Sequence, residues 1–297
     1  MARRKVIITC ALTGGVHGKE ANPNLPEQPD EIIEQGIAAW KAGAAILHCH
    51  ARDPEGKPTT DIAIFSKIYQ GLLTETDAII NLTTGGGLGL SVEERIRSTE
   101  LVPEICTLNM GLLDFILRGE EFFFSNHRSE ITWFVETMRD KGIKPELECY
   151  NIVMIEESMR LIDTGILDPP YMFNIVLNTP TLGGLKGTPE NLFDMVKRIP
   201  KDAVLTVSSM GSTQLPLTTI GMAMGLHARV GLEDNVHYAA GELSTSNAQL
   251  VERAVRVAGE LQLDVATPDE ARVIVGLPLV RQAPIGAQPV TTKEESI

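Results

Sequence analysis

The strongest constraint on the fold is a rhythm that repeats along the chain: a short β-branched run, a Gly-rich or polar loop, then a helical pattern. Eight such units of roughly 30 residues are what a (β/α)8 barrel requires. A doubly wound open sheet is the alternative, but it rarely needs eight strands and usually has a nucleotide-binding loop after the first. We therefore predict an α/β fold, a (β/α)8 TIM barrel. The predicted strands, each with its helix, are 5–13 and 29–42, 45–50 and 61–73, 78–83 and 92–101, 104–109 and 130–141, 144–150 and 154–164, 172–177 and 189–199, 203–207 and 215–225, 228–232 and 247–261.

The 297 residues contain no Pro-, Gly- and Ser-rich stretch long enough to act as an interdomain linker. We therefore predict a single barrel domain over residues 1–278, with any active site at its mouth. Residues 279–297 are rich in Pro, Thr, Gln and charge. We predict that they form a C-terminal tail, either mobile or packed on a neighbouring subunit.

Charge and composition exclude several classes of partner. The net charge of −13, from 26 Lys+Arg against 39 Asp+Glu, argues against nucleic acid, because duplex binding needs a basic face. No stretch reaches the roughly 18 consecutive apolar residues of a membrane span. The four cysteines lie singly in apolar runs, which is typical of buried thiols in a reducing compartment. We expect a cytoplasmic protein.

Two histidines end the second predicted strand. His48 and His50 share one face of it, because side chains alternate along a strand. With Leu47 and Cys49 packed under the helices, both imidazoles point into the barrel mouth, where catalytic groups of this fold lie. Two such imidazoles can chelate one Zn²⁺ or another borderline divalent ion. The alternative is a hydrogen-bonded pair of core histidines.

The end of the eighth predicted strand offers a third ligand. Arg229 and Glu233 face the same side by period two, and Asp234 follows directly. Two His and one carboxylate with an open position form a catalytic zinc arrangement that polarises a carbonyl, and the neighbouring acid can act as a base. The alternative is a plain polar loop. A buried Arg229 needs a partner, so it either pairs with Asp234 or binds a substrate carboxylate.

The third, fourth and fifth predicted strands also carry polar groups on one face. In the loop 83–87, successive glycines and threonine hydroxyls either let backbone amides approach an anion or form a tight turn. An interior this polar is a poor core and a good pocket. The candidate pocket residues are Thr83, Gly86, Thr107, Asn109, Glu146 and Glu148.

Five motifs, in order from the first strand to the eighth, together resemble the β-keto acid cleavage enzymes, the group that includes 3-keto-5-aminohexanoate cleavage enzyme. They are ALTG at 11–14 with NPNLP at 22–26, HCHAR at 48–52, TTGG at 83–86, LNMG at 108–111 and RVGLEDN at 229–235. Each is weak alone, but five in register over nearly the whole chain are specific.

The resemblance implies a zinc-dependent barrel, usually a homotetramer, that converts a β-keto acid and acetyl-CoA into acetoacetate and a new CoA thioester. By the same resemblance, His48, His50 and Glu233 are the zinc ligands. Asp234 is the general base, oriented with Arg229. The substrate-binding positions that match the family's are Thr83, Gly86 and Thr107.

One departure from the family bears on the substrate. Where the aminohexanoate enzyme has an acidic residue that pairs with the substrate amine, this chain has Val16. The substitution predicts an uncharged or apolar β-keto acid side chain, unless Glu146 or Glu148 supplies the anion. The alternative functions are a metal-dependent aldolase or hydrolase, which needs no thioester, and a non-catalytic binding barrel, which needs no metal.

Overall fold

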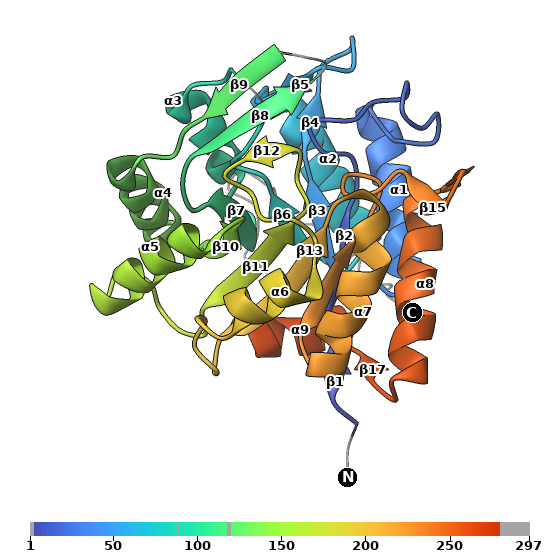
Figure 1. Cartoon of the computed structure of the whole chain (residues 1–297). Coiled ribbons are helices and arrows are strands. Elements are labelled where there is room, and N and C mark those ends of the chain that lie inside the picture. Colours follow the sequence, from blue (N-terminus) through green and yellow to red (C-terminus); the bar gives the residue numbers. More distant parts are fainter. Residues whose placement is uncertain (1–2, 88, 118–119, 280–297) are drawn as a thin grey trace, which may run out of the picture.

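Eight parallel strands close into one barrel in the computed structural model, which describes residues 3–87, 89–117 and 120–279 (Figure 1). Closure comes from the pairing of the last barrel strand with the first. This architecture confirms the predicted (β/α)8 fold. The strands, in order around the barrel, are β2 (Ile8–Ala11), β3 (Ile46–Cys49), β6 (Ile79–Leu82), β7 (Ile105–Asn109), β10 (Lys144–Cys149), β11 (Met172–Leu177), β13 (Val204–Ser209) and β14 (His227–Val230).

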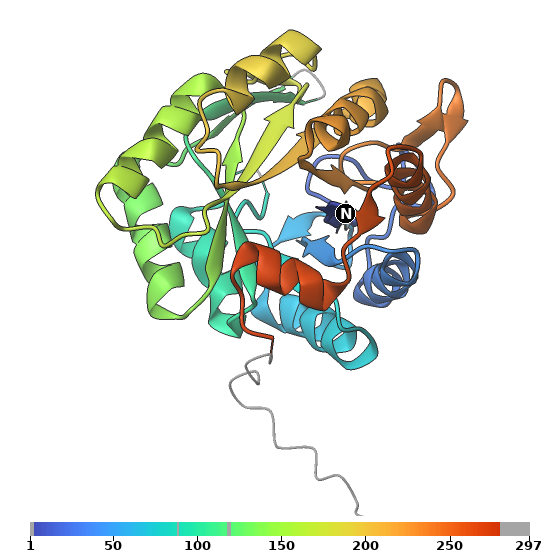
Figure 2. The same cartoon turned by 90° about the horizontal axis from the view of Figure 1, so that it is seen from below.

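Helices surround the barrel and cover its outer face (Figure 2). Several begin at a side chain that accepts a hydrogen bond from an otherwise unpaired backbone N–H, as Asn151 does from Met154 and Ser246 from Gln249. The surrounding helices are α1 (Pro29–Lys41), α2 (Ile62–Glu75), α3 (Val92–Arg95), α4 (Arg128–Asp140), α5 (Ile152–Asp163), α6 (Pro189–Val196), α7 (Gln214–Met224) and α8 (Asn247–Glu260).

Three predicted elements differ in detail. The eighth predicted strand, 228–232, is β14 and ends at Val230, so Glu233 lies in the turn that follows and is not placed by strand alternation. The first apolar run is divided into β1 (Lys5–Val6) and β2, and only β2 belongs to the barrel. The predicted helix over 92–101 is α-helical only as far as Arg95 and continues as the 3₁₀ helix η1 (Ile96–Leu101). There the Thr99 hydroxyl donates to the Ile96 carbonyl, a local side-chain bond that competes with regular helical pairing.

An additional helix, α9 (Pro268–Val275), lies across the amino-terminal end of the barrel (Figure 2). Its Ala271 and Val275 belong to one apolar cluster with Ile46, Ile79 and Ile105 of the barrel strands. β17 (Asp264–Val265) leads into this helix and pairs with β1. The bottom of the barrel is therefore closed, and a ligand must enter from the opposite end.

Short strands decorate that opposite end. The hairpin of β8 (Leu113–Leu117) and β9 (Glu120–Phe124), which the sequence analysis did not predict, pairs with β12 (Thr181–Leu182) to form a small sheet at the mouth (Figure 1). The remaining elements are the pairs β4 (Ala51–Arg52) with β5 (Pro58–Thr59) and β15 (His237–Ala239) with β16 (Glu242–Leu243), and the 3₁₀ helix η2 (Gly211–Thr213).

Strand alternation separates an apolar layer from a polar interior, as predicted. Leu47 and Cys49 belong to the large apolar core, whereas His48 between them is a buried polar residue of the inner face. All four cysteines are free and buried. Among the described residues, no helix has the length and hydropathy that crossing a bilayer requires. The predicted tail lies, beyond Leu279, outside the described residues.

His227 at the start of β14 makes stability depend on pH. Burial lowers its pKa to about 4, Arg4 adds to the shift, and its Nδ1 accepts a hydrogen bond from Ile7 N. Since an unfolded histidine binds a proton below about pH 6.5, the free energy of unfolding should fall by up to about 1.4 kcal/mol per pH unit between 6.5 and 4. His227→Asn keeps an acceptor and should flatten this slope in urea unfolding at pH 7.5, 6 and 5. Parallel slopes would contradict the assignment.

Candidate active site

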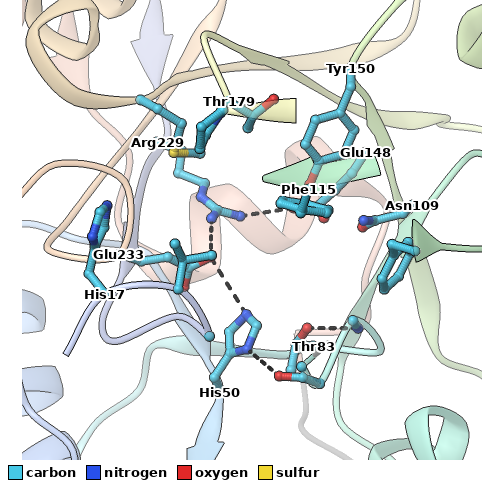
Figure 3. A pocket seen from close by; sticks show the side chains of 18 residues that line it. His17, His50, Thr83, Asn109, Phe115, Glu148, Tyr150, Thr179, Arg229 and Glu233 are labelled. Carbon is cyan, nitrogen blue, oxygen red and sulfur yellow. Dashed lines mark hydrogen bonds and ion pairs between the residues drawn. The ribbon is translucent and has the colours of Figure 1, made fainter. Parts of the chain in front are cut away.

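A cavity opens at the carboxyl ends of the barrel strands, beside the small sheet at the mouth (Figure 3). Its polar lining residues include His50, Glu148, Arg229 and Glu233. Its apolar and aromatic lining residues include Val16, Phe115, Phe124, Tyr150, Pro180 and Met210.

Three side chains from distant parts of the chain converge at this end. Glu233 Oε1 lies 3.6 Å from His48 Nε2 and 3.6 Å from His50 Nε2. One donor atom from each residue lies within 4.8 Å of the others. Bonds of about 2 Å from a common point are compatible with such a spacing, so the three residues form a possible metal site.

The two rings are held at different angles and by different contacts. Their planes meet at 79° in an edge-on arrangement. His50 Nδ1 lies 3.2 Å from the Gly86 carbonyl oxygen, so an Nδ1–H donated there leaves Nε2 free to act as a ligand. Burial lowers the pKa of His48 to about 3, so its ring is neutral at pH 7, the state in which an imidazole binds a metal.

Two glycines make room for Glu233. A side-chain carbon at Gly14, which has φ +66°, would lie 2.5 Å from Glu233 Cγ. One at Gly231, φ +143°, would lie 2.0 Å from the Ala11 carbonyl oxygen. The chain after β14 can therefore pass close to β2, where Glu233 N donates to Ala11 O. This close approach brings Glu233 near His48 in β3 and His50 directly after it.

Arg229 lies among three carboxylates, those of Glu148, Glu233 and Asp234. Figure 3 shows its contacts with Glu148 and Glu233. It forks onto both oxygens of Asp234 at 3.0 and 2.9 Å, and also donates to Glu148 at 2.9 Å and to Glu233 at 2.5 Å. The predicted pairing with Asp234 is therefore present. Three acids, two of them buried and Glu233 largely so, outnumber the one guanidinium, and Glu233 Oε2 has no hydrogen-bond partner among the described residues. A divalent cation beside Glu233 would offset this excess, so the residues fit a metal.

The same crowding gives the three acids different pKa values. Burial raises the pKa of Glu148 to about 8 and that of Asp234 to about 6, against the opposing pull of Arg229. Burial also acts against ionisation of Glu233, but Arg229 and the two imidazoles outweigh it and hold the pKa of Glu233 well below its usual range. Glu233 is thus the acid most suited to a permanent negative charge.

The other predicted site residues occupy two depths. Val16, Thr83, Gly86 and Asn109 line the cavity. The Thr83 hydroxyl accepts from Gly85 N at 2.9 Å, so the loop is a tight turn whose backbone also faces the cavity. The predicted residues beneath the cavity surface are His48, Thr107, Glu146 and Asp234, each at most 1% exposed.

Glu146 is bound inside the barrel rather than facing a ligand. Asn81 Nδ2 donates to Glu146 Oε2 at 2.5 Å, and Glu146 is fully buried. The acid from β10 that lines the cavity is Glu148. Both acids share one strand face, but Glu146 comes two residues earlier and therefore lies deeper.

Sequence reasoning missed several lining residues. His17, which the sequence analysis did not single out, lines the cavity beside Val16. Phe115 and Phe124 come from the unpredicted hairpin, and their rings meet edge-on at 6.4 Å. Tyr150 follows Glu148 by one strand repeat. Only Tyr150 carried a usable signal, since it extends the inward-facing series of β10.

Comparison with known proteins decides the family. A model of the beta-keto acid cleavage enzyme family matches residues 5–277. The chain belongs to this family. It is accordingly an enzyme of the acetyl-CoA-dependent class that cleaves β-keto acids and transfers acyl groups.

Relatives of known activity match over nearly their full length. A 3-keto-5-aminohexanoate cleavage enzyme from Acetoanaerobium sticklandii is 38% identical over 92% of this chain and 98% of its own. A 3,5-dioxohexanoate:acetyl-CoA acetone transferase from Paraburkholderia graminis is 37% identical over 93% of this chain and 96% of its own. The structure of ObcA with oxaloacetate superposes with a TM-score of 0.72 at 18% identity, over 86% of this chain and 68% of that one, a likeness of fold alone.

Proposed function

We propose that this family member is a zinc enzyme that converts a β-keto acid with an uncharged side chain and acetyl-CoA into acetoacetate and a new acyl-CoA. The observation that carries the proposal is the convergence of His48, His50 and Glu233, of which the last two line the cavity and His48 lies just beneath them. A zinc ion bound there would polarise the keto oxygen and make the α-hydrogens more acidic. The protein's own side chains then transfer the proton and position the substrate.

Asp234 takes a proton from the α-carbon of the β-keto acid in this proposal. Arg229, which forks onto Asp234, holds the carboxylate in place. The carbanion then forms a carbon–carbon bond with the acetyl carbonyl, and the CoA thiolate leaves. The thiolate attacks the original keto carbon, and the bond from that carbon to the α-carbon breaks. The α-carbon regains the proton, which leaves acetoacetate and a new thioester.

Thr83, Gly86, Thr107 and Asn109 are our candidates for substrate positioning. Thr83, Gly86 and Asn109 support this role by lining the cavity. Thr107 lies beneath them, where its carbonyl accepts from the Thr84 hydroxyl at 2.6 Å. We propose that Thr107 acts on the substrate indirectly, by holding the turn at residues 83–87 in place through this hydrogen bond.

The preference for an uncharged side chain rests on the apolar residues of the cavity lining. Among the described residues, the acids that line it are Glu148 and Glu233, and both already pair with Arg229. His17 stays neutral near pH 7, because burial lowers its pKa. Val16 adds an aliphatic surface. The Paraburkholderia relative named for 3,5-dioxohexanoate also acts on a substrate without a charged side chain.

Introducing an acid at position 16 tests this preference. Val16→Asp should raise kcat/KM for 3-keto-5-aminohexanoate relative to 3-oxohexanoate by roughly fivefold, the effect of a partly exposed ion pair of about 1 kcal/mol. Val16→Asn is the matched variant, with the same shape and no charge, and should leave the ratio unchanged. Equal ratios for the two variants would contradict a charge effect at this position.

Acetoacetate release tests the function itself. Purified protein with zinc should form acetoacetate from uncharged β-keto acids only when acetyl-CoA is present, and one new acyl-CoA should appear for each acetoacetate. Cleavage without acetyl-CoA would instead support the metal-dependent aldolase or hydrolase. No turnover with any β-keto acid would contradict both.

We also propose a homotetramer in the cytoplasm. The sheet at the mouth supports an assembly, because Phe123 and Leu182 on it are 64% and 70% exposed, and exposed apolar surface marks interaction sites. Light scattering after size exclusion should give four chains per particle.

A further inference from the structure

His48 has a buried ring nitrogen that faces away from the possible metal site. Its Nε2 is the atom near Glu233, so Nδ1 points into the barrel wall, and no hydrogen-bond partner for Nδ1 exists among the described residues. Asn81 Oδ1 and Glu146 Oε1 are likewise buried and without partners. A buried polar atom without a hydrogen bond costs roughly 1–3 kcal/mol, so three of them on one inner face need an explanation.

The strand register places these groups beside one another. His48 on β3 lies directly opposite Asn81 on β6, and both are at most 1% exposed. His48 Nδ1, a possible donor, and Asn81 Oδ1, an acceptor, are both buried and have no other partner among the described residues. On its other side, Asn81 Nδ2 donates to Glu146 Oε2 at 2.5 Å.

We infer that Asn81 and Glu146 are positioning residues for the metal: His48 Nδ1–H donates to Asn81 Oδ1, and Asn81 Nδ2–H donates to Glu146. The inference rests on the proposed function, because it requires a metal at His48 Nε2. This one hydrogen bond gives a partner to both His48 Nδ1 and Asn81 Oδ1. It also fixes the tautomer with the free lone pair on Nε2, as the Gly86 carbonyl does for His50.

Glu146 holds the amide in one orientation. An asparagine amide can turn by 180° and present N–H instead of oxygen to the ring. With the carboxylate of Glu146 accepting from Nδ2, only the orientation that presents Oδ1 to His48 keeps both contacts. The buried acid beneath the cavity thereby acts on the metal through two intervening side chains.

Zinc affinity, measured by competition with a chromophoric chelator, tests the inference. Loss of such an outer contact typically weakens metal binding about 10- to 100-fold, and we expect this for Asn81→Leu. Glu146→Leu should weaken binding nearly as much, whereas Glu146→Gln keeps an acceptor and should stay within about threefold of the parent. The double variant Asn81→Leu/Glu146→Leu should be no weaker than Asn81→Leu, because the contacts act in series.

Asn174→Leu is the matched control. Asn174 is a fully buried interior amide on β11 that accepts a hydrogen bond from Ser208. Within the described part of the chain it makes no hydrogen bond to a proposed ligand, so its replacement should leave zinc affinity within about threefold. In ¹⁵N-histidine NMR spectra of the zinc-loaded protein, the His48 Nδ1–H signal should be protected in the parent and exchange faster in Asn81→Leu. If Asn81→Leu fails to fold, Glu146→Leu against Glu146→Gln makes the same comparison.

The possible failures are distinguishable. A parent chain that binds no zinc overturns the proposed function together with the inference. A parent that binds zinc while Asn81→Leu binds equally well, or while Asn174→Leu is weakened just as much, overturns only the inference. Additive losses in the double variant overturn the serial arrangement.

Discussion

Asp234→Asn should lower kcat by about 10³-fold or more while zinc remains bound, because general base catalysis typically contributes 10²–10⁴-fold. The substitution keeps the shape of the side chain and one acceptor for Arg229, but it removes the group proposed to take the α-proton. The measurement is acetoacetate formation with saturating acetyl-CoA, together with zinc content by mass spectrometry.

The control for this prediction is Asp269→Asn. Asp269 also pairs with an arginine, Arg272, at 3.1 Å, but it lies on α9 at the closed end of the barrel. It should retain full activity. Near-normal turnover in Asp234→Asn together with a large loss in Glu148→Gln would transfer the role of base to Glu148, the acid that lines the cavity.

His50→Ala should weaken zinc binding by more than about 100-fold, the upper range for loss of a contact beyond the ligands themselves, and turnover should fall with it. The ring supplies one of three donor atoms and is itself held by Gly86 O. The measurement is zinc retained after dialysis against a chelator, followed by activity at fixed excess zinc.

His237→Ala is the control, since His237 is exposed on β15 and does not line the cavity. It should retain both zinc and activity. If His50→Ala bound zinc as tightly as the parent, the histidine pair would be a packing feature rather than a ligand pair.

The repeated succession of apolar runs and helical patterns predicted the barrel, because each outer helix buries one stripe of its surface and each barrel strand is buried on both faces. The alternation of Leu47, His48 and Cys49 correctly separated the helix-packed side from the inner side. The hairpin of β8 and β9 was not predicted, since its pairing with β12 joins segments more than 60 residues apart, as with Phe115 and Thr181. No local pattern records such a contact.

Depth within the barrel was the other quantity that the sequence left open. Alternation places Glu146 and Glu148 on the same face, and both do face inward. Which of them reaches the cavity depends on the stagger between neighbouring strands, and this stagger is a property of the closed barrel. The structure places Glu148 at the cavity and joins Glu146 to Asn81.

X-ray absorption spectroscopy of the protein loaded with one equivalent of zinc tests the central claim most directly. We expect two imidazole nitrogens at about 2.0–2.1 Å and a carboxylate oxygen at a similar distance, with one nitrogen lost in His50→Ala and no change in His237→Ala. A zinc environment without imidazole, or one that is identical in His50→Ala, would contradict the account.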